Sequence, residues 1–388
     1  MRQVDILIAG GGMVGAASAL ALANLGLTVL VFEAQAPEEF DATQPLDLRV
    51  SAISQASERL LKELDGWQGV ESMRSAPYCT LETWEWQGAN IVFDAAELQL
   101  SHLGHIVENR ILQLSLWQTL RRHPRIELLT GARPQRYWQD EQGVYAELDG
   151  QFYQGQLLLG CDGAQSQVRQ QAGIGVSGWQ YRQHCLAINI RTEAPQQSGT
   201  WQEFTPTGPR ALLPLAGQHA SLVWYDSPQR IAALKRLPLP ELKQAIVAAF
   251  PERLGEFEIE RFASFPLTRQ HAKQYYKDRV VLLGDAAHTI NPLAGQGVNL
   301  GFKDVAMLAE VLADALQRGE SLHSSKVLGR YQRFRRPDNL AMQSAMDAFY
   351  LMFSNDHMPL KVLRNLGLTL AQNSGPIKNQ VMKYAMGL

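Results

Sequence analysis

The sequence predicts an α/β protein in which a parallel-sheet domain is interrupted by a mixed or antiparallel sheet and is followed by C-terminal helices. Three observations predict this class. A strand–helix–strand unit with a glycine-rich turn opens the chain. Short strand-like runs separated by Gly, Pro and Ser fill residues 185–225. A buried-strand pattern then returns at residues 279–285, so the first domain is expected to resume after the insert.

The N-terminal unit sets the direction of the sheet. Residues 4–9, VDILIA, have the continuous apolar character of a short buried strand. A helix is predicted over residues 14–25, ended by Gly26, and residues 28–33, TVLVFE, form the second strand. A strand, a helix and a strand in this order start a parallel sheet.

The middle of the chain adds further strands to both sheets. A helix is predicted over residues 111–123, followed by IELLT, an alternating YAEL segment, a turn at Asp149-Gly150 and the apolar run QLLLG, which ends at Gly160. The runs LAINIRT, WQEF, RALLPL and ASLVWY favour an antiparallel insert, which a helix at residues 238–249 and the segment FASFPLTR extend to about residue 279.

These elements divide the chain into three parts. The nucleotide-binding domain is predicted to be discontinuous, and the C-terminal part is predicted to be helical. The domains are assigned as residues 1–75, 100–180 and 280–340 for the nucleotide-binding domain, 76–99 and 181–279 for the substrate domain, and 341–388 for the helical region.

Composition excludes several classes of function. The formal net charge of −2 and the absence of a basic tract interleaved with aromatic residues argue against a nucleic-acid partner. Three widely spaced cysteines fit a reducing compartment and argue against a disulfide framework or a thiolate metal site, and no metal is predicted. No window approaches the ~18 uninterrupted apolar residues of a membrane span. We therefore expect a cytoplasmic protein.

The first motif is GGGMVG, which places Gly10, Gly12 and Gly15 directly after a strand and at the start of a helix. Gly10 permits the tight turn, Gly12 lets a pyrophosphate approach the backbone, and Gly15 lets the helix pack closely on the strand. Glu33 ends the second strand, where a carboxylate can accept hydrogen bonds from a ribose. The motif therefore predicts a dinucleotide site.

The second motif is CDGAQSQVR, residues 161–169, which again follows a buried strand. Asp162 and Gly163 form a turn, and Ser166 can cap the helix that follows. Arg169 can reach a phosphate or pair with Asp162. A capped helix without a ligand explains these residues equally well.

The third motif is GDAAHTINPLAGQGVNLGFKD, residues 284–304. Asp285 ends a strand at the sheet edge where ligands of parallel sheets bind. Gly295 and Gly297 let the backbone lie against a flat ring, and the amides of Val298 and Asn299 open a helix whose N-terminus stabilises an anion. A reduced flavin carries such an anion at its N1 and O2 edge.

In this order and spacing, the three motifs resemble the single-component FAD-dependent aromatic hydroxylases of the para-hydroxybenzoate hydroxylase type. Within that family, several segments are similar to the ubiquinone-biosynthesis hydroxylases, and the resemblance covers the whole chain. These segments are LDLRVSAIS (46–54), HLGHIVEN (102–109), GDAAHTINPLAGQGVNLG (284–301) and KYAMGL (383–388).

The resemblance implies a Rossmann-like FAD-binding domain and a monooxygenase reaction. NAD(P)H, a transient reductant, reduces FAD, O2 adds to give a flavin hydroperoxide, and its distal oxygen attacks the ring of a polyprenylated benzoquinol in ubiquinone biosynthesis. A flavin-dependent reductase or halogenase on the same fold remains an alternative. So does a catalytically silent FAD-binding subunit of a biosynthetic assembly.

The resemblance also implies roles for individual residues. Most of these residues would bind the cofactor. The ADP half of FAD would be held by Gly10, Gly12, Gly15 and Glu33, and the ribityl and pyrophosphate region by Asp285. The flavin would contact Arg49 on one side, and its ring would lie against Gly295, Gly297, Val298 and Asn299. Asp162 and Arg169 would contact both FAD and the reductant. Pro292 would lie beside the isoalloxazine, with its carbonyl accepting a hydrogen bond from the substrate hydroxyl. Many members carry arginine where this chain has Asn109, with Arg110 beside it, so that contact stays open.

The insert and the C-terminus supply candidate surfaces for the substrate and for partners. Aromatic and aliphatic side chains of the insert could wall a dry pocket, although each is more commonly a core residue. These are Trp84, Trp86, Trp201, Phe204, Leu213 and Trp224. From Arg330 onward the chain carries eight Lys/Arg against three Asp and is rich in Met, which favours peripheral contact with the inner membrane or docking of other ubiquinone-biosynthesis proteins. An ordinary helical lid explains it equally well, and a homo-oligomer stays open.

Overall fold

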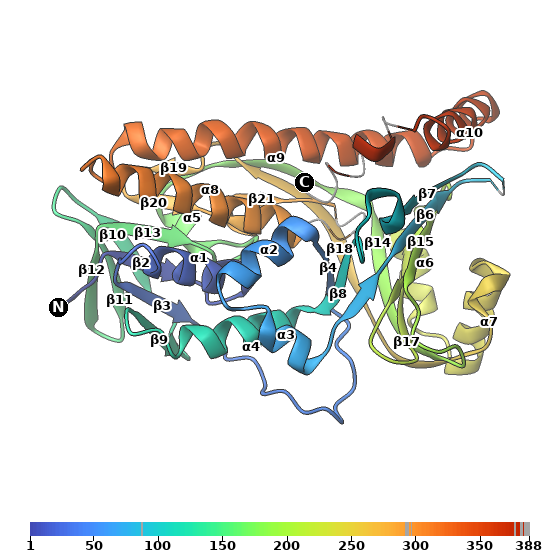
Figure 1. The fold of residues 1–388 in the computed structure, drawn as a ribbon, viewed down its shortest axis with the longest axis horizontal. Helices are drawn as coiled ribbons and strands as arrows, with labels where there is room; N and C mark the ends of the chain where they lie inside the picture. The colour runs from blue at the N-terminus through green and yellow to red at the C-terminus, as the bar shows by residue number, and fades with distance from the viewer. Residues whose placement is uncertain (87, 292–294, 296, 376–377, 381–382, 384–388) are drawn as a thin grey trace.

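The computed structural model describes residues 1–86, 88–291, 295, 297–375, 378–380 and 383. Its nucleotide lobe is built on a six-stranded sheet whose strands come from both ends of the chain (Figure 1). In spatial order the strands are β19 (Tyr276–Lys277), β20 (Val280–Leu282), β13 (Leu157–Gly160), β2 (Ile6–Ala9), β3 (Val29–Glu33) and β9 (Ile126–Thr130). All neighbours except β19 and β20 are parallel. The predicted return of the chain to the first sheet through RVVLLGD is thereby confirmed.

Helices with apolar faces cover this sheet. The helix α1 (Met13–Ala23) is buried along almost its whole length because its side chains are small or apolar. It packs against α4 (Asn109–Leu120) and α8 (Gly297–Gln317). The short helix α5 (Gln167–Gln171) follows β13.

Two smaller sheets extend this lobe. A three-stranded antiparallel sheet joins β4 (Val50–Ser54), β8 (Gly104–Glu108) and β5 (Ala76–Tyr78). The helix α2 (Gln55–Glu63) contacts β4, and α3 (Gln68–Met73) packs against α4. A four-stranded sheet joins β1, β12, β11 and β10, which span Arg2–Gln3, Gln151–Gly155, Val144–Leu148 and Arg136–Gln139. The predicted Asp149-Gly150 turn is confirmed, because both residues have positive φ between β11 and β12.

The second lobe is an eight-stranded, mostly antiparallel sheet. Its strands are β21 (His288–Thr289), β18 (Phe257–Ala272), β14 (Val176–Thr192), β17 (His219–Asp226), β16 (Arg210–Pro214), β15 (Gly199–Glu203), β6 (Thr80–Trp84) and β7 (Asn90–Asp94). The helices α6 (Pro228–Leu234) and α7 (Leu239–Ala249) cover one face and bury Ile231, Leu242 and Ile246. Short 3-10 turns at Ala95–Leu98, Glu252–Leu254 and Gly284–Ala286 complete the elements.

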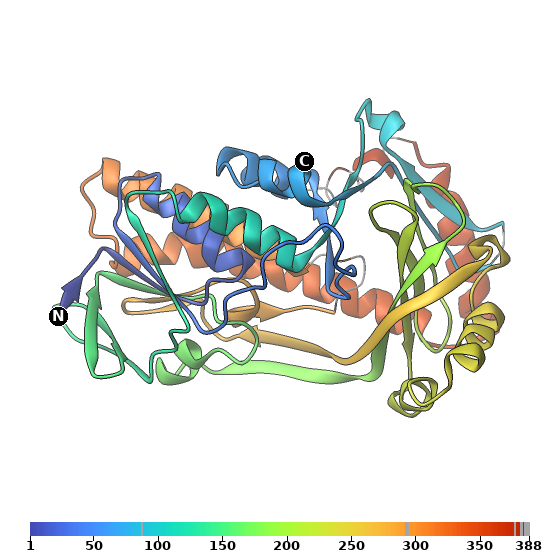
Figure 2. The ribbon, with the colours of Figure 1, turned by 90° about the horizontal axis from the view of Figure 1, so that it is seen from below.

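Two long strands connect the lobes. Strands β14 and β18 pair antiparallel over their length and run from the nucleotide lobe into the insert (Figure 2). Their register shifts between Gln180 and His184, where a bulge interrupts the ladder. The pairing therefore begins earlier in the chain than the antiparallel run predicted from residue 185.

The C-terminal helices lie across both lobes. The helix α9 (Ser325–Phe353) packs along α8 and continues over the insert, and α10 (Met358–Gln372) lies beside β7 (Figure 1). The side chain of Ser324 caps α9. Within the described ranges, no helix combines the length and the apolar character that crossing a membrane requires.

Candidate functional site

The glycine-rich turn leaves one face open and closes the other. Gly10 has φ of 96°, and a Cβ there would lie 2.5 Å from the Cys161 carbonyl oxygen. A Cβ on Gly15 would lie 1.8 Å from the Gly10 carbonyl oxygen, so both positions require glycine for packing. At Gly12, a Cβ would meet nothing within 4 Å, and no side chain caps α1 there. The first amides of α1 therefore face open space that a phosphate can enter.

Glu33 lies beside this turn at the end of β3. One carboxylate oxygen, Oε2, accepts a hydrogen bond from the Gly11 amide at 2.6 Å, and Oε1 accepts one from the Gln35 amide at 2.9 Å. The carboxylate is thereby held at the carboxyl edge of the sheet. Each oxygen keeps a further lone pair for a ligand hydroxyl.

The second motif packs directly behind the first. Asp162 Oδ2 accepts hydrogen bonds from the amides of Gln167 and Val168 at 2.7 and 3.1 Å, and Ser166 Oγ accepts one from the Arg169 amide at 2.9 Å. The predicted capping by Ser166 is confirmed. The other carboxylate oxygen of Asp162 is buried and has no hydrogen-bond partner in the described part of the chain. An orphaned acceptor at this edge fits a ligand hydroxyl or amide.

Arg169 lies deeper than the sequence indicates. Its side chain is buried, and its guanidinium donates to the carbonyls of Ala286 and Ala164, each at 2.8 Å. It therefore ties the second motif to the third. Its guanidinium bonds to these main-chain oxygens and makes no hydrogen bond to Asp162 within the described residues. Its predicted contact with a phosphate stays a prediction.

The third motif meets the N-terminal half of the chain. Asp285 follows β20 and opens to solvent. Desolvation by the surrounding protein raises its pKa, and nearby His288 and Arg49 oppose that rise, so the exposed Arg49 lies within electrostatic reach of Asp285. Gly295 has φ of 65°, and a Cβ there would lie 3.0 Å from the Ala52 Cβ. The loop therefore approaches β4 more closely than a residue with a side chain could.

Asn299 fixes the start of α8 against β4 and α2. Its side-chain oxygen accepts hydrogen bonds from the Ser54 amide at 3.1 Å and the Ser57 hydroxyl at 2.8 Å, and its Nδ2 donates to the Ala52 carbonyl at 2.8 Å. Sequence reasoning considered the amide of Asn299 and missed this clamp. Gly297 and Val298 form the first residues of α8, whereas the predicted contact through Pro292 lies outside the described residues.

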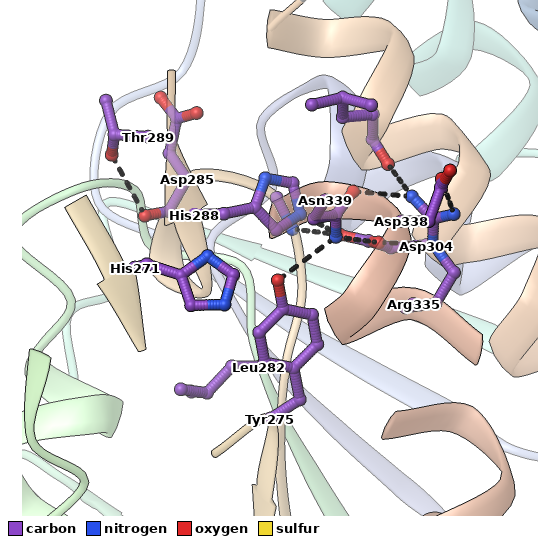
Figure 3. Close-up of polar contacts among 12 residues, drawn as sticks. His271, Tyr275, Leu282, Asp285, His288, Thr289, Asp304, Arg335, Asp338 and Asn339 are labelled. Carbon is purple, nitrogen blue, oxygen red and sulfur yellow. Dashed lines mark hydrogen bonds and ion pairs between the residues drawn. The ribbon is translucent and has the colours of Figure 1, made fainter. Parts of the chain in front are cut away.

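A buried polar network underlies the third motif (Figure 3). Asp304 is fully buried, and its carboxylate contacts His288, accepts from the Gly284 amide at 3.0 Å and pairs with Arg335 at 2.8 Å. Burial alone would raise the pKa of Asp304, but His288 and Arg335 lower it to about 2. The network anchors the Asp285 loop to α8 and α9. Asp304 lies on the buried face of α8, and an acidic residue among the apolar residues of that face is the signal in the sequence that indicates such a network.

A small apolar cluster faces the Gly295 loop. Ala52 and Ile106 on the three-stranded sheet pack with Leu215 and the partly buried Leu213 from the insert. The tryptophans proposed as pocket walls lie elsewhere: Trp84, Trp201 and Trp224 belong to the core beneath α6 and α7. The commoner core assignment is therefore confirmed for these three.

Comparisons with known proteins agree with this geometry. Residues 3–343 match the model of the FAD binding domain family. The chain is 50% identical over 388 residues to 3-demethoxyubiquinol 3-hydroxylase of Escherichia coli, covering 100% of this chain and 99% of that protein. It is 37% identical to ubiquinone hydroxylase UbiL of Rhodospirillum rubrum, covering 100% and 90%. The crystal structure of p-nitrophenol 4-monooxygenase PnpA from Pseudomonas putida aligns with a TM-score of 0.82 at 20% identity, covering 100% of this chain and 99% of that one.

Proposed function

This chain belongs to the FAD binding domain family, and on that premise we propose that it is an FAD-dependent monooxygenase that hydroxylates the ring of a polyprenylated benzoquinol in ubiquinone biosynthesis. The observation that carries the proposal is the convergence of three loops. The loops after β2, β13 and β20 hold Gly10, Asp162 and Asp285, and these strands are parallel neighbours. Their carboxyl ends therefore form one edge, where nucleotides bind in such sheets. The 50% sequence identity to the Escherichia coli 3-demethoxyubiquinol 3-hydroxylase, which extends over the full length of this chain, supports the proposed hydroxylation.

The residues present fit the ADP half of FAD. We propose that the pyrophosphate lies over Gly12, where the structure leaves space beside the uncapped start of α1. Glu33, fixed beside the turn, would accept the ribose hydroxyls. Asp162, with its orphaned buried oxygen, and Asp285 would accept hydrogen bonds nearer the ribityl chain.

The same edge fits the flavin half. We propose that the isoalloxazine lies against Gly295 and Gly297, with the amides of Val298 and Asn299 at its O2 edge and Arg49 on its outer side. The close approach of Gly295 to β4 and the clamp of Asn299 support this placement. A role for the Pro292 carbonyl in accepting a substrate hydroxyl bond is proposed from the family resemblance alone.

When bound, FAD supplies the redox chemistry between NAD(P)H, O2 and the ring. The task of this chain is then to orient the ring and exclude water. The apolar cluster of Ala52, Ile106, Leu213 and Leu215 provides a dry wall next to the Gly295 loop. Arg169 ties the second motif to the third through the Ala286 carbonyl, and Asp304 fixes the start of the third motif through the Gly284 amide.

The lipid tail of such a substrate calls for a surface near membrane lipid. Nine large apolar side chains are exposed over the end of α9 and along α10, and exposed apolar groups gathered in this way mark an interaction surface. They are Phe349, Leu351, Met352, Met358, Leu360, Val362, Leu363, Leu366 and Leu370. We propose that this surface, the α10 surface, makes peripheral contact with the inner membrane from the cytoplasmic side. Docking of other ubiquinone-biosynthesis proteins there, or of a second copy of this chain, would compete with lipid.

Purified protein loaded with FAD tests the proposed reaction. We expect NAD(P)H oxidation to be stimulated by a demethoxylated polyprenyl benzoquinol and the product to gain one oxygen atom from O2, detected by mass spectrometry with ¹⁸O2. Turnover without O2 would indicate a reductase, and dependence on halide a halogenase. Bound FAD without any quinol-stimulated oxidation would indicate a silent subunit.

A further inference from the structure

Two histidines and a glutamate converge behind the three-stranded sheet, on the face opposite the apolar cluster. His105 precedes Ile106 on β8, and because neighbouring strand residues point to opposite faces, His105 points away from the proposed flavin. Glu58 lies on α2, and His102 lies in the turn before β8. Glu58 is only 4% exposed and His105 9%, so the cluster is almost closed to solvent.

The donor atoms of the three side chains point at one another. His102 Nε2 lies 2.8 Å from Glu58 Oε2, and His105 Nδ1 lies 3.4 Å from the same oxygen. All three ligand atoms lie within 4.8 Å of one another. The two imidazole rings are 4.4 Å apart and edge-on, and Trp67 packs 5.0 Å from the His105 ring, which restricts its rotation.

The contacts of the cluster depend on which ring nitrogen of His102 carries the proton: on Nε2 it is donated to Glu58 Oε2, and on Nδ1 it is donated to Ser101 Oγ. Ser101 Oγ lies 2.8 Å from His102 Nδ1, so a proton on Nδ1 leaves Nε2 with a lone pair facing the carboxylate. His105 Nδ1 is buried and has no hydrogen-bond partner in the described ranges, because its contact with Glu58 is poorly aligned. With the proton of His102 on Nδ1, the lone pairs of Nε2 and of the carboxylate face one another, and a cation between them would satisfy both.

Glu58 directs its two carboxylate oxygens to different partners, and both histidines lie next to the same oxygen, Oε2. Lys62 contacts the other carboxylate oxygen, Oε1, at 2.7 Å, and its half-exposed side chain can turn into solvent. Glu58 Oε2 therefore stays available as a charged ligand atom.

We propose that Glu58 Oε2, His102 Nε2 and His105 Nδ1 bind a divalent transition-metal ion, best matched by Zn²⁺, with water in a fourth position. Two imidazoles and one carboxylate form a common zinc ligand set. Tetrahedral bonds of about 2.0–2.1 Å place ligand atoms roughly 3.3 Å apart. The 3.4 Å between Glu58 and His105 matches this spacing, and the 2.8 Å between Glu58 and His102 would widen by about half an ångström on binding. Ser101, on the second ring nitrogen of His102, occupies the place of the partner that usually orients a metal-bound histidine.

The site would be structural and independent of the proposed reaction. It joins α2 to the turn before β8, which is otherwise tied to α2 through the bond from Gln55 Nε2 to the His102 carbonyl at 2.7 Å. The start of α2 holds Asn299 through Ser54 and Ser57. Metal binding would therefore stiffen the support of α8.

Equilibrium dialysis of the FAD-loaded, chelator-treated protein against Zn²⁺ tests the site. We expect one equivalent of zinc bound, release of protons on binding, and a thermal unfolding midpoint that rises with free zinc. Glu58→Gln and His102→Ala should lose that equivalent and the rise. His357→Ala, which removes an exposed histidine at the start of α10, should keep both.

The result is independent of activity, so it does not depend on the proposed reaction. Equal zinc uptake by the wild type and by folded Glu58→Gln or His102→Ala protein would mean only adventitious binding, and no uptake by the wild type would mean that protons fill the cluster. Either outcome overturns the proposal. If Glu58→Gln does not fold, His102→Ala decides alone, because this residue is more exposed than Glu58.

Discussion

At the scale of single residues, the glycines of the first motif show how one residue type serves two purposes. Gly15 exists because backbone lies where its side chain would be, whereas Gly12 has empty space there. A sequence pattern cannot distinguish a glycine required for packing from one required for ligand access, because the residue is the same. The structure distinguishes them, and it therefore predicts different consequences for the same substitution at Gly12 and at Gly15.

Gly15→Ala should destabilise the FAD-free protein by about 3 kcal/mol, because the added methyl group meets main-chain atoms that cannot move aside. Gly12→Ala should leave the FAD-free protein as stable as the wild type but weaken FAD binding about tenfold or more, since the methyl group keeps the pyrophosphate from the amides. Urea unfolding and FAD titration separate the two effects. Wild-type FAD affinity in Gly12→Ala would contradict the proposed pyrophosphate position.

The pH dependence of stability should include a contribution from His271. This residue is buried beside His288, and desolvation, followed by the charge of His288, lowers its pKa to about 4. Because the folded pKa lies below the unfolded value of 6.5, the unfolded chain binds the proton first as pH falls. The contribution of the neutral His271 to the free energy of unfolding is therefore fully present above pH 6.5 and is lost as the pH falls toward 4.

The free energy of unfolding of wild-type protein should therefore decrease between pH 6.5 and 4, and His271→Asn should show a flatter profile over that range. Urea unfolding at several pH values measures it. The control is His123→Asn, a residue on the turn after α4, which should keep the wild-type slope. Identical slopes in wild type and His271→Asn would refute the prediction.

At the scale of elements, the strands of the parallel sheet are the ones that the sequence predicts best. The strands β2, β3, β9 and β13 were found within two residues because their apolar runs are short and bounded by glycine, polar residues or a helix. The strands β4, β5, β6 and β7 do not follow from the sequence pattern, because they are only partly apolar. The partner of β4 and β5, β8, also lies well along the chain from them. Strand β6 pairs locally with β7 in an antiparallel hairpin, but every residue of the two strands except Trp84 is only partly buried, so no clear apolar alternation marks them. The other neighbour of β6, the parallel strand β15, comes more than a hundred residues later.

The α10 surface makes a testable prediction for one element. Leu363→Glu with Leu370→Glu replaces side chains that are 64% and 63% exposed, so the fold should be preserved while binding to anionic phospholipid vesicles falls about tenfold or more. Co-sedimentation with vesicles measures the change. The matched control is Leu239→Glu with Val247→Glu on α7, 53% and 60% exposed.

The control introduces the same charge on another face and should bind vesicles like the wild type. Equal loss in both variants would mean that charge alone matters. Unchanged binding by the α10 variant would assign the surface to a protein partner or to a second copy of the chain.

At the scale of the whole molecule, the candidate site is assembled from distant stretches of chain. Residues 10–33, 162–169, 285–291 and 297–299 meet at one sheet edge, although the insert separates the last two ranges from the others. The order of motifs predicted this meeting. The supports were not predictable, because Arg169, Asn299 and Asp304 acquire their roles only from partners brought together by folding.

FAD should therefore stabilise the chain as one unit. At an FAD concentration about 100 times the dissociation constant, the free energy of unfolding should rise by about 2.7 kcal/mol. Calorimetry should show a single transition that moves to higher temperature, because the site includes segments on both sides of the insert. Two transitions, only one of which responds to FAD, would show that the lobes unfold separately.

The paired strands β14 and β18 carry a mechanical consequence. Because the two strands are joined by backbone hydrogen bonds along their length, the ribbon is hard to stretch and keeps the two lobes at a fixed distance. The ribbon has register shifts at Gln180–His184 and at Asn189–Ile190, and the first leaves the longer unpaired stretch, so we expect the ribbon to bend most easily there. If the insert rocks over the nucleotide, we expect the ribbon to bend at this unpaired stretch. The two lobes could then separate enough to admit a long lipid chain while the remaining backbone hydrogen bonds between β14 and β18 stay in place.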